Sequence, residues 1–124
     1  MTRRILVVDD EPATELLMRQ IFRKEVKRGE YELSFAFNGD EALVVLEGSE
    51  IELVMTDINM PGMDGLTLLS HIHESYTHIK VIMISAYNDK AKIEMARGHG
   101  ACEFINKPIK MNEVRALVRD LLGL

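Results

Sequence analysis

Short apolar runs recur along the chain, and each of them is followed by polar residues. The runs occupy residues 5–8, 53–56, 81–84 and 104–106. Their lengths are typical of β-strands, and the runs at 53–56 and 81–84 are apolar almost throughout, as expected for parallel strands that helices cover on both faces. These two strands and the first one are therefore predicted to lie in the middle of a sheet.

Residues 31–37 show a different pattern, because apolar and less apolar positions alternate. The larger side chains are Tyr31, Leu33, Phe35 and Phe37. A period of two is typical of a strand with one less buried side, so we expect this strand at an edge of the sheet. The following Asn38-Gly39 pair predicts a turn into a short helix over residues 40–47.

Helical spacing of apolar residues separates the strands. Pro12 suits the first turn of a helix, and the apolar residues that follow it at helical spacing, up to Gly29, are Leu16, Leu17, Ile21 and Phe22. Further helices are predicted over residues 65–75, 88–98 and 111–122. The last of these has the clearest core-facing stripe, formed by Val114, Leu117, Val118 and Leu121. The helix over 88–98 has only a thin stripe of Ala91, Ile93 and Met95, so we expect it to be weakly held.

Strands and helices thus alternate strictly, which predicts an α/β fold of five βα units. Right-handed crossovers make a doubly wound, three-layer sandwich around a parallel five-stranded sheet the leading topology. With 124 residues and no linker or repeat, residues 1–124 are predicted to form one domain.

Composition and charge narrow the functional classes. The chain is 47% hydrophobic and 28% charged, which is typical of a soluble globular protein, and no apolar run approaches the length of a membrane span or signal peptide. We therefore expect a cytoplasmic protein without a membrane partner. The net charge of −5 disfavours direct binding of nucleic acid. Cys102 is the only cysteine, so we expect a small buried side chain rather than redox chemistry.

The carboxyl ends of parallel strands lie along one edge of a sheet, which brings the residues after the runs together. They are Asp9, Asp10, Asp57, Ser85 and Lys107. Three carboxylates in one place would repel one another unless a cation intervenes, and Mg²⁺ prefers oxygen ligands of this kind. The pattern therefore predicts a divalent-cation site at an edge suited to phosphoryl transfer.

Four motifs together resemble the receiver domain of two-component response regulators. They are residues 7–12 (VVDDEP), 57–65 (DINMPGMDG), 85–87 (SAY) and 100–108, which ends in Lys107-Pro108. The resemblance covers essentially the whole chain and implies the strand order 2-1-3-4-5. It also implies Asp57 as the phosphoacceptor, with Lys107 neutralising charge on the transferred group and a cis bond before Pro108.

The same resemblance implies a metal site and a switch. Asp10, Asp57 and the backbone carbonyl of Asn59 would bind Mg²⁺, for which Mn²⁺ is expected to substitute, while Asp9 would act mostly through water. Ser85 would donate its hydroxyl to the phosphoryl group, and Phe104 would rotate inward. Phe104 lacks the hydroxyl of a tyrosine, so packing alone would drive this rotation and change the surface around the fourth and fifth strands and the helices that follow them.

The resemblance also implies the partners of the domain and the reactions that the domain would catalyse on itself. A histidine kinase or phosphotransfer protein would supply the phosphoryl group. The changed surface would control a partner or an output domain missing from this sequence, through a phosphorylation-dependent homodimer or a downstream effector. The domain would catalyse only its own phosphorylation and dephosphorylation, with Asn59 and Tyr87 tuning the lifetime of the phosphoryl group. The partner face would include Lys92, Glu94, Arg97, Arg115, Arg119 and Asp120.

Two other functional classes remain open at this point. A haloacid-dehalogenase-like phosphatase also uses a strand-end aspartate and Mg²⁺, but it needs a second acid where this chain has Asn59. A flavodoxin-like electron carrier needs a hydroxyl-rich phosphate loop after the first strand, where Asp9, Asp10 and Glu11 would repel the flavin phosphate.

Several conspicuous residues are predicted to be structural only. Asn38-Gly39 and Asp64-Gly65 are expected to form turns and helix caps. The four histidines are expected at the surface, and Met60 and Met63 near the rim of the site.

Overall fold

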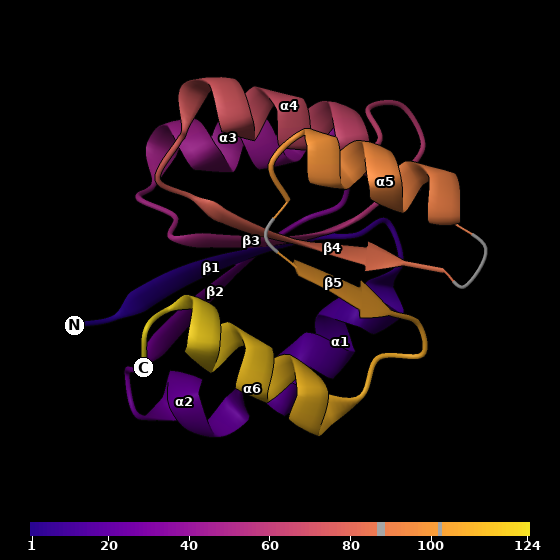
Figure 1. The fold of residues 1–124 in the computed structure, drawn as a ribbon. Helices are drawn as coiled ribbons and strands as arrows, with labels where there is room; N and C mark the ends of the chain where they lie inside the picture. Colours follow the sequence, from indigo (N-terminus) through magenta and orange to yellow (C-terminus); the bar gives the residue numbers. More distant parts are fainter. Residues whose placement is uncertain (87–88, 102) are drawn as a thin grey trace.

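A single parallel sheet organises the molecule. The computed structural model describes residues 1–86, 89–101 and 103–124, and Figure 1 shows its elements. The strands are β1 (Arg3–Val8), β2 (Tyr31–Ala36), β3 (Leu53–Asp57), β4 (Lys80–Ser85) and β5 (Glu103–Asn106). Neighbouring strands pair in parallel in the order β2-β1-β3-β4-β5. The predicted strand order and the edge position of β2 are confirmed.

Helices cover both faces of this sheet. They are α1 (Pro12–Ile21), α2 (Arg23–Lys27), α3 (Gly39–Gly48), α4 (Gly65–Ser75), α5 (Lys90–Gly98) and α6 (Met111–Leu121). In Figure 1, α3, α4 and α5 lie on one face and α1, α2 and α6 on the other. The predicted doubly wound, three-layer sandwich is therefore confirmed.

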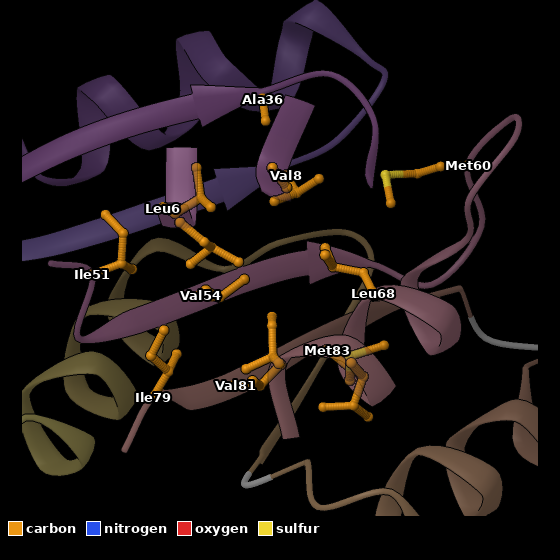
Figure 2. Close-up of a cluster of buried hydrophobic side chains, with 14 of the residues drawn as sticks. Leu6, Val8, Ala36, Ile51, Val54, Met60, Leu68, Ile79, Val81 and Met83 are labelled. Carbon is orange, nitrogen blue, oxygen red and sulfur yellow. The ribbon is translucent and has the colours of Figure 1, made fainter. Parts of the chain in front are cut away.

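Each face of the sheet has its own hydrophobic core. Figure 2 shows part of the core beneath α3, α4 and α5, where Leu6, Val54 and Val81 of three adjacent strands meet Leu68 of α4. Along β1 the side chains alternate between the two cores, because Ile5 and Val7 pack on the opposite face with α1 and α6. Both faces of the central strands are therefore removed from water.

The first predicted helix differs from the structure in its packing. It divides at Phe22 into α1 and α2, although backbone bonds from Phe22 to Met18 and from Val26 to Phe22 continue across the division. Leu16 was expected to face the core but is 69% exposed, whereas Met18 is fully buried. Apolar residues occupy three successive positions here, and the contact with the sheet selects the face that carries Met18 and Ile21.

The predicted stripe of the next-to-last helix is also wrong. Ala91 is exposed and Met95 is 54% exposed, whereas Ala96 is the fully buried residue of α5 and Ile93 packs beside it. Apolar residues lie on several sides of this helix, so periodicity alone did not fix the buried face. A single fully buried side chain agrees with the weak anchoring predicted for α5, which stays a prediction.

The last helix follows its predicted stripe and is tied to α1 and α2. Val114 and Val118 of α6 are buried. Arg115 was expected on the exposed partner face, but its guanidinium lies 2.8 Å from Glu25 and donates to the carbonyl of Ile21 at 2.8 Å. Arg115 therefore joins α6 to the other helices of its face.

The predicted caps are confirmed. Asn38 accepts a hydrogen bond from the backbone N–H of Glu41 at 2.8 Å, and Asp64 accepts one from Thr67 at 2.9 Å. All four histidines are exposed. Within the described ranges, no helix has the length and apolar character needed to cross a bilayer.

Candidate phosphoryl-transfer site

The strand ends bring the predicted acidic residues together. Asp57 is the last residue of β3, and Asp9 and Asp10 follow β1, its neighbour in the sheet. Carboxylate oxygens of the three residues lie within 4.8 Å of one another. Asp9 and Asp57 are buried and Asp10 is exposed. Three carboxylates around one point are a donor set that fits Mg²⁺ or Mn²⁺, because these hard cations take oxygen ligands.

Asp57 is held by one donor on each carboxylate oxygen. Its Oδ1 accepts from the backbone N–H of Asn59 at 3.1 Å, and its Oδ2 accepts from Nζ of Lys107 at 2.8 Å. Burial raises the pKa of Asp57, and these two donors lower it without cancelling the effect of burial. The carboxylate is therefore more basic than an exposed aspartate.

Lys107 approaches three acidic side chains. Besides Asp57, its Nζ lies 3.3 Å from Oε1 of Glu11 and 3.8 Å from Oδ2 of Asp9. Burial lowers the pKa of Lys107, but the hydrogen bond and charge of Asp57 raise the pKa by more than burial lowers it, so the net shift is upward. The ammonium therefore stays charged across the physiological range. The peptide bond to Pro108 is cis, as the resemblance implied.

Asp9 has a structural role that sequence reasoning did not identify. Its Oδ1 accepts from the backbone N–H of Glu11 at 3.0 Å, and its Oδ2 accepts from the hydroxyl of Thr14 at 2.6 Å. Both oxygens are thus engaged by the start of α1, whereas Asp10 is exposed. The only available signal in the sequence was a threonine in the first turn of the following helix. This arrangement agrees with a direct metal contact from Asp10 and a mediated one from Asp9.

Ser85 is fully buried at the end of β4, where its hydroxyl donates to Oδ1 of Asn106 at 3.1 Å. Asn106 is its partner in the register of β4 and β5. The half-buried Phe104, one of the two predicted switch residues, packs against the core beneath α5, and the guanidinium of Arg97 lies 5.1 Å from its ring centroid. Ser85 therefore reaches the site only if its hydroxyl leaves Asn106.

Asn59 joins two loops above the sheet. Its side-chain amide donates to Oδ2 of Asp89 at 3.1 Å, and its Oδ1 accepts from Nζ of Lys92. The resemblance predicts Lys92 only as part of a partner face and gives no role to Asp89, so neither contact follows from it. Tyr87, the second residue predicted to tune the phosphoryl lifetime, lies outside the described residues, as does Cys102.

A small hollow adjoins this pair of loops. It measures about 390 Å³, and its lining includes Asn59, Met60 and Lys92. Met60 is otherwise buried in the core beneath α4, and the half-buried Met63 packs against the same core. Met60 thus lines the hollow beside Asn59, whereas Met63 is not among the residues that line it.

Comparison with known proteins is consistent with this geometry. A model of the response regulator receiver domain matches residues 5–119. Sporulation initiation phosphotransferase F of Bacillus subtilis (strain 168) is 32% identical over 124 residues, which cover 100% of this chain and 97% of that protein. Response regulator protein FleR of Pseudomonas aeruginosa is 33% identical over 99% of this chain, but the match covers only 25% of FleR.

Solved structures of receiver domains are similar to this chain in both fold and sequence. The receiver domain of NtrX from Brucella abortus superposes with a TM-score of 0.87 at 33% identity, covering 96% of this chain and 98% of that domain. A CheY-like receiver domain protein from Methanospirillum hungatei JF-1 gives a TM-score of 0.90 at 28% identity, covering 99% of this chain and 95% of that one. The chain belongs to the response regulator receiver domain family of two-component signalling, whose members are signalling phosphoacceptors rather than classical enzymes.

Proposed function

We propose that residues 1–124 act as one receiver domain in which Asp57 accepts a phosphoryl group from a phosphohistidine on a histidine kinase or phosphotransfer protein. The observation that carries this proposal is the buried Asp57 carboxylate, held between the ammonium of Lys107 and the backbone N–H of Asn59 and flanked by two more carboxylates. A buried nucleophile with fixed cationic and N–H donors beside it is what phosphoryl transfer requires.

The transfer needs one bond to form and one to break. A carboxylate oxygen of Asp57 attacks phosphorus in line, the bond between phosphorus and the imidazole nitrogen breaks, and the electron pair stays on that nitrogen. Lys107 stabilises negative charge on the phosphoryl oxygens because its Nζ already lies 2.8 Å from Oδ2 of Asp57.

The acidic cluster gives the reaction its metal dependence. Asp10, Asp57 and the backbone carbonyl of Asn59 would hold Mg²⁺ or Mn²⁺, and Asp9 would contribute through water. When bound, the cation supplies positive charge to the phosphoryl oxygens and offsets repulsion among the carboxylates. Asp9 also holds the start of α1 in place, because its carboxylate accepts hydrogen bonds from Thr14 and Glu11.

The phosphorylated state would act through the surface formed by β4, α5, β5 and α6. Ser85 would exchange Asn106 for a phosphoryl oxygen, and Phe104 would move inward beneath α5. This change would promote a homodimer or the binding of a downstream effector. Self-phosphorylation and self-dephosphorylation would be the only chemistry, with Asn59 and Tyr87 setting the rate at which water attacks the acyl phosphate.

Two alternatives have less support. Asn59 stands where a haloacid-dehalogenase-like phosphatase needs its second acid, and its side chain is engaged by Asp89 and Lys92. The carboxylates after β1 lie where a flavodoxin-like carrier would hold the flavin phosphate. Neither class is favoured by a specific contact of the described residues.

The phosphoacceptor can be tested by mass spectrometry. Incubation with acetyl phosphate and Mg²⁺ should add the mass of one phosphoryl group to the wild-type protein and to the Asp120→Asn control, in which an exposed carboxylate of α6 is neutralised. Asp57→Asn should show no increment. Persistence of the increment in Asp57→Asn would place the acceptor elsewhere. Sedimentation with and without beryllofluoride would test for the homodimer.

A further inference from the structure

A hollow of about 620 Å³ lies between β2 and the helices α1 and α2. Its lining includes the apolar side chains of Val26 and Leu33. It also includes Thr2 and Gly29, which precede β1 and β2. Because the strands are parallel, this hollow lies at the amino ends of the strands, opposite the edge that carries Asp57. The candidate phosphoryl-transfer site therefore does not account for it.

Three cationic side chains line this hollow at intervals of four residues. They are Arg19, Arg23 and Lys27, which we call the basic row, and all three are exposed. Backbone hydrogen bonds continue from α1 into α2 across Phe22, so the three residues follow one another along the same side of a nearly continuous helix. Each step of four residues advances about 6 Å along that helix.

Acidic side chains neutralise the basic row only in part. Arg19 lies 2.9 Å from Glu15, and its guanidinium also lies 4.4 Å from the ring centroid of Phe35 in β2. The other two cations of the row form no ion pair among the described residues. Among the described residues that line the hollow, Glu32 is the one carboxylate, and it lies 3.8 Å from Arg4. The hollow is therefore a positive surface on a chain whose net charge is −5.

The outer edge of β2 is open beside this hollow. β2 is the outermost strand of the sheet next to β1. At one end of this strand pair, the carbonyl of Glu30 accepts from Arg3 at 2.8 Å. At the other end, the carbonyl of Ala36 accepts from Asp9 at 3.1 Å. Backbone groups alternate in direction along a strand, so the residues between these even-numbered positions direct their N–H and C=O groups outward. These residues are Tyr31, Leu33 and Phe35.

The open edge and the basic row have matching spacings. Arg19 lies over Phe35 near the end of β2, whereas Lys27 lines the hollow together with Tyr31 at the start of β2. The row and the strand therefore run side by side. An extended chain advances about 6.6 Å for every two residues, close to the step of the row. Alternate side chains of a strand added to β2 would thus meet successive cations.

We propose that the open edge of β2 and the basic row together form a docking groove for an extended acidic segment of a partner protein. The segment adds a further strand beside β2, and carboxylates at alternate positions pair with Arg19, Arg23 and Lys27. Main-chain hydrogen bonds to the edge supply affinity, and the charge pairs select an acidic sequence. The groove is separate from Asp57, so this proposal does not depend on the proposed function.

Amide hydrogen exchange with a model peptide tests the docking groove. The probe is a capped peptide of about seven residues, with glutamate at its second, fourth and sixth positions and threonine or valine elsewhere. At saturation it should slow exchange of the Leu33 and Phe35 amides at least about fivefold, because these N–H groups gain acceptors. The amide of Ser34 already faces β1, so its exchange should not change.

Charge variants test the role of the basic row. Arg23→Glu should weaken binding of the glutamate peptide about tenfold, because it replaces an attraction by a repulsion. Lys24→Glu is the matched control, since Lys24 is adjacent and exposed but does not line this hollow, and it should weaken binding less than about threefold. The same peptide with glutamine in place of glutamate should bind at least about tenfold more weakly to the wild-type protein.

The proposal is overturned if the glutamate peptide does not bind, or if it binds without slowing exchange at Leu33 and Phe35. Equal affinity for the glutamine peptide, or equal effects of Arg23→Glu and Lys24→Glu, would also overturn it. Single-stranded oligothymidylate serves as a polyanion without a peptide backbone. If it binds the wild-type protein more tightly than the glutamate peptide does, the basic row is a nucleic-acid contact and the proposal is wrong.

Discussion

The ammonium of Lys107 lies 2.8 Å from Oδ2 of Asp57 and 3.8 Å from Oδ2 of Asp9, so one cation faces two buried carboxylates. Neither aspartate has another cationic side chain within ion-pairing distance among the described residues. Lys107 therefore balances charge in the metal-free protein, in addition to the role in phosphoryl transfer that we propose for it.

Substitution of Lys107 by alanine should destabilise the metal-free protein. Removing one partner leaves the buried carboxylates uncompensated, which we expect to lower the free energy of unfolding by about 1–2 kcal/mol, since the side chain of Lys107 is partly exposed. Urea unfolding in a chelating buffer measures this change. Lys110→Ala, an exposed lysine in the same segment, should shift it by less than about 0.5 kcal/mol. Equal stability of the two variants would show that Lys107 does not balance the site.

The raised pKa of Asp57 predicts a dependence of stability on pH. The folded protein holds this proton above the ordinary value of 3.8, so between the ordinary and the raised pKa it binds more protons than the unfolded chain. The free energy of unfolding therefore falls as pH rises through that window, by about 1.4 kcal/mol for each unit of upward shift, and the loss persists at higher pH.

Asp57→Asn lacks this titration. We expect its stability advantage over the wild type in metal-free buffer to grow as pH rises from below the ordinary aspartate pKa through the raised one. Urea unfolding at a series of pH values measures the difference, with Asp120→Asn as the control. A difference that is constant with pH would contradict the upward shift.

Sequence patterns placed the acidic cluster correctly because its position depends only on topology. Asp9, Asp10 and Asp57 follow apolar runs, and once the runs form neighbouring parallel strands, the carboxyl ends must meet. Lys107 reaches the same edge from β5, two strands away from β3. The same argument placed Ser85 at the edge but gave no information on its hydroxyl, which bonds to Asn106.

Side-chain partners within loops could not be predicted in this way. The contacts of Asp89 with Ala86 and Asn59 depend on rotamers and loop conformations that leave no period in the sequence. For Leu16 and Met18 the difficulty was geometric, because both positions fit a helical stripe and packing against the sheet decides which one is covered. The local sequence pattern narrows the candidates for the buried face of a helix, and tertiary contacts decide between them.

Asp9 and Asp10 should differ in their effects on metal binding and folding. Asp10→Asn removes the exposed carboxylate that we propose as a metal ligand. It should therefore abolish most of the rise in melting temperature that Mg²⁺ produces and leave the metal-free protein about as stable as the wild type. Asp9→Asn disturbs the bonds to Thr14 and Glu11, so it should also lower metal-free stability, by about 1 kcal/mol.

Thermal unfolding with increasing Mg²⁺, repeated with Mn²⁺, measures both effects. Thr14→Val offers a matched test of the structural role, because it removes only the hydroxyl that donates to Asp9. A full Mg²⁺ response in Asp10→Asn would exclude Asp10 as a direct ligand.

Gly65 controls the position of the Asp57 backbone. A Cβ atom at Gly65 would lie 2.2 Å from the carbonyl oxygen of Asp57 and 2.8 Å from Cα of Ile58, and both contacts are with backbone that cannot rotate away. The N–H of Gly65 also donates to the carbonyl of Ile58 at 2.8 Å, which holds the start of α4 against the end of β3. Any added side chain must therefore separate α4 from Asp57.

Gly65→Ala should lower the free energy of unfolding by about 2–3 kcal/mol, as overpacking against fixed backbone does. Gly48→Ala is the matched control, because Gly48 ends α3 with open space around it and alanine favours a helix, so stability should rise by up to about 1 kcal/mol. Gly65→Ala should also slow phosphorylation by acetyl phosphate under conditions where it stays folded, since displacement of Asp57 moves its carboxylate away from Lys107. Equal urea midpoints for the two variants would mean that the end of β3 moves to accommodate the methyl group, and that close packing of α4 does not position Asp57.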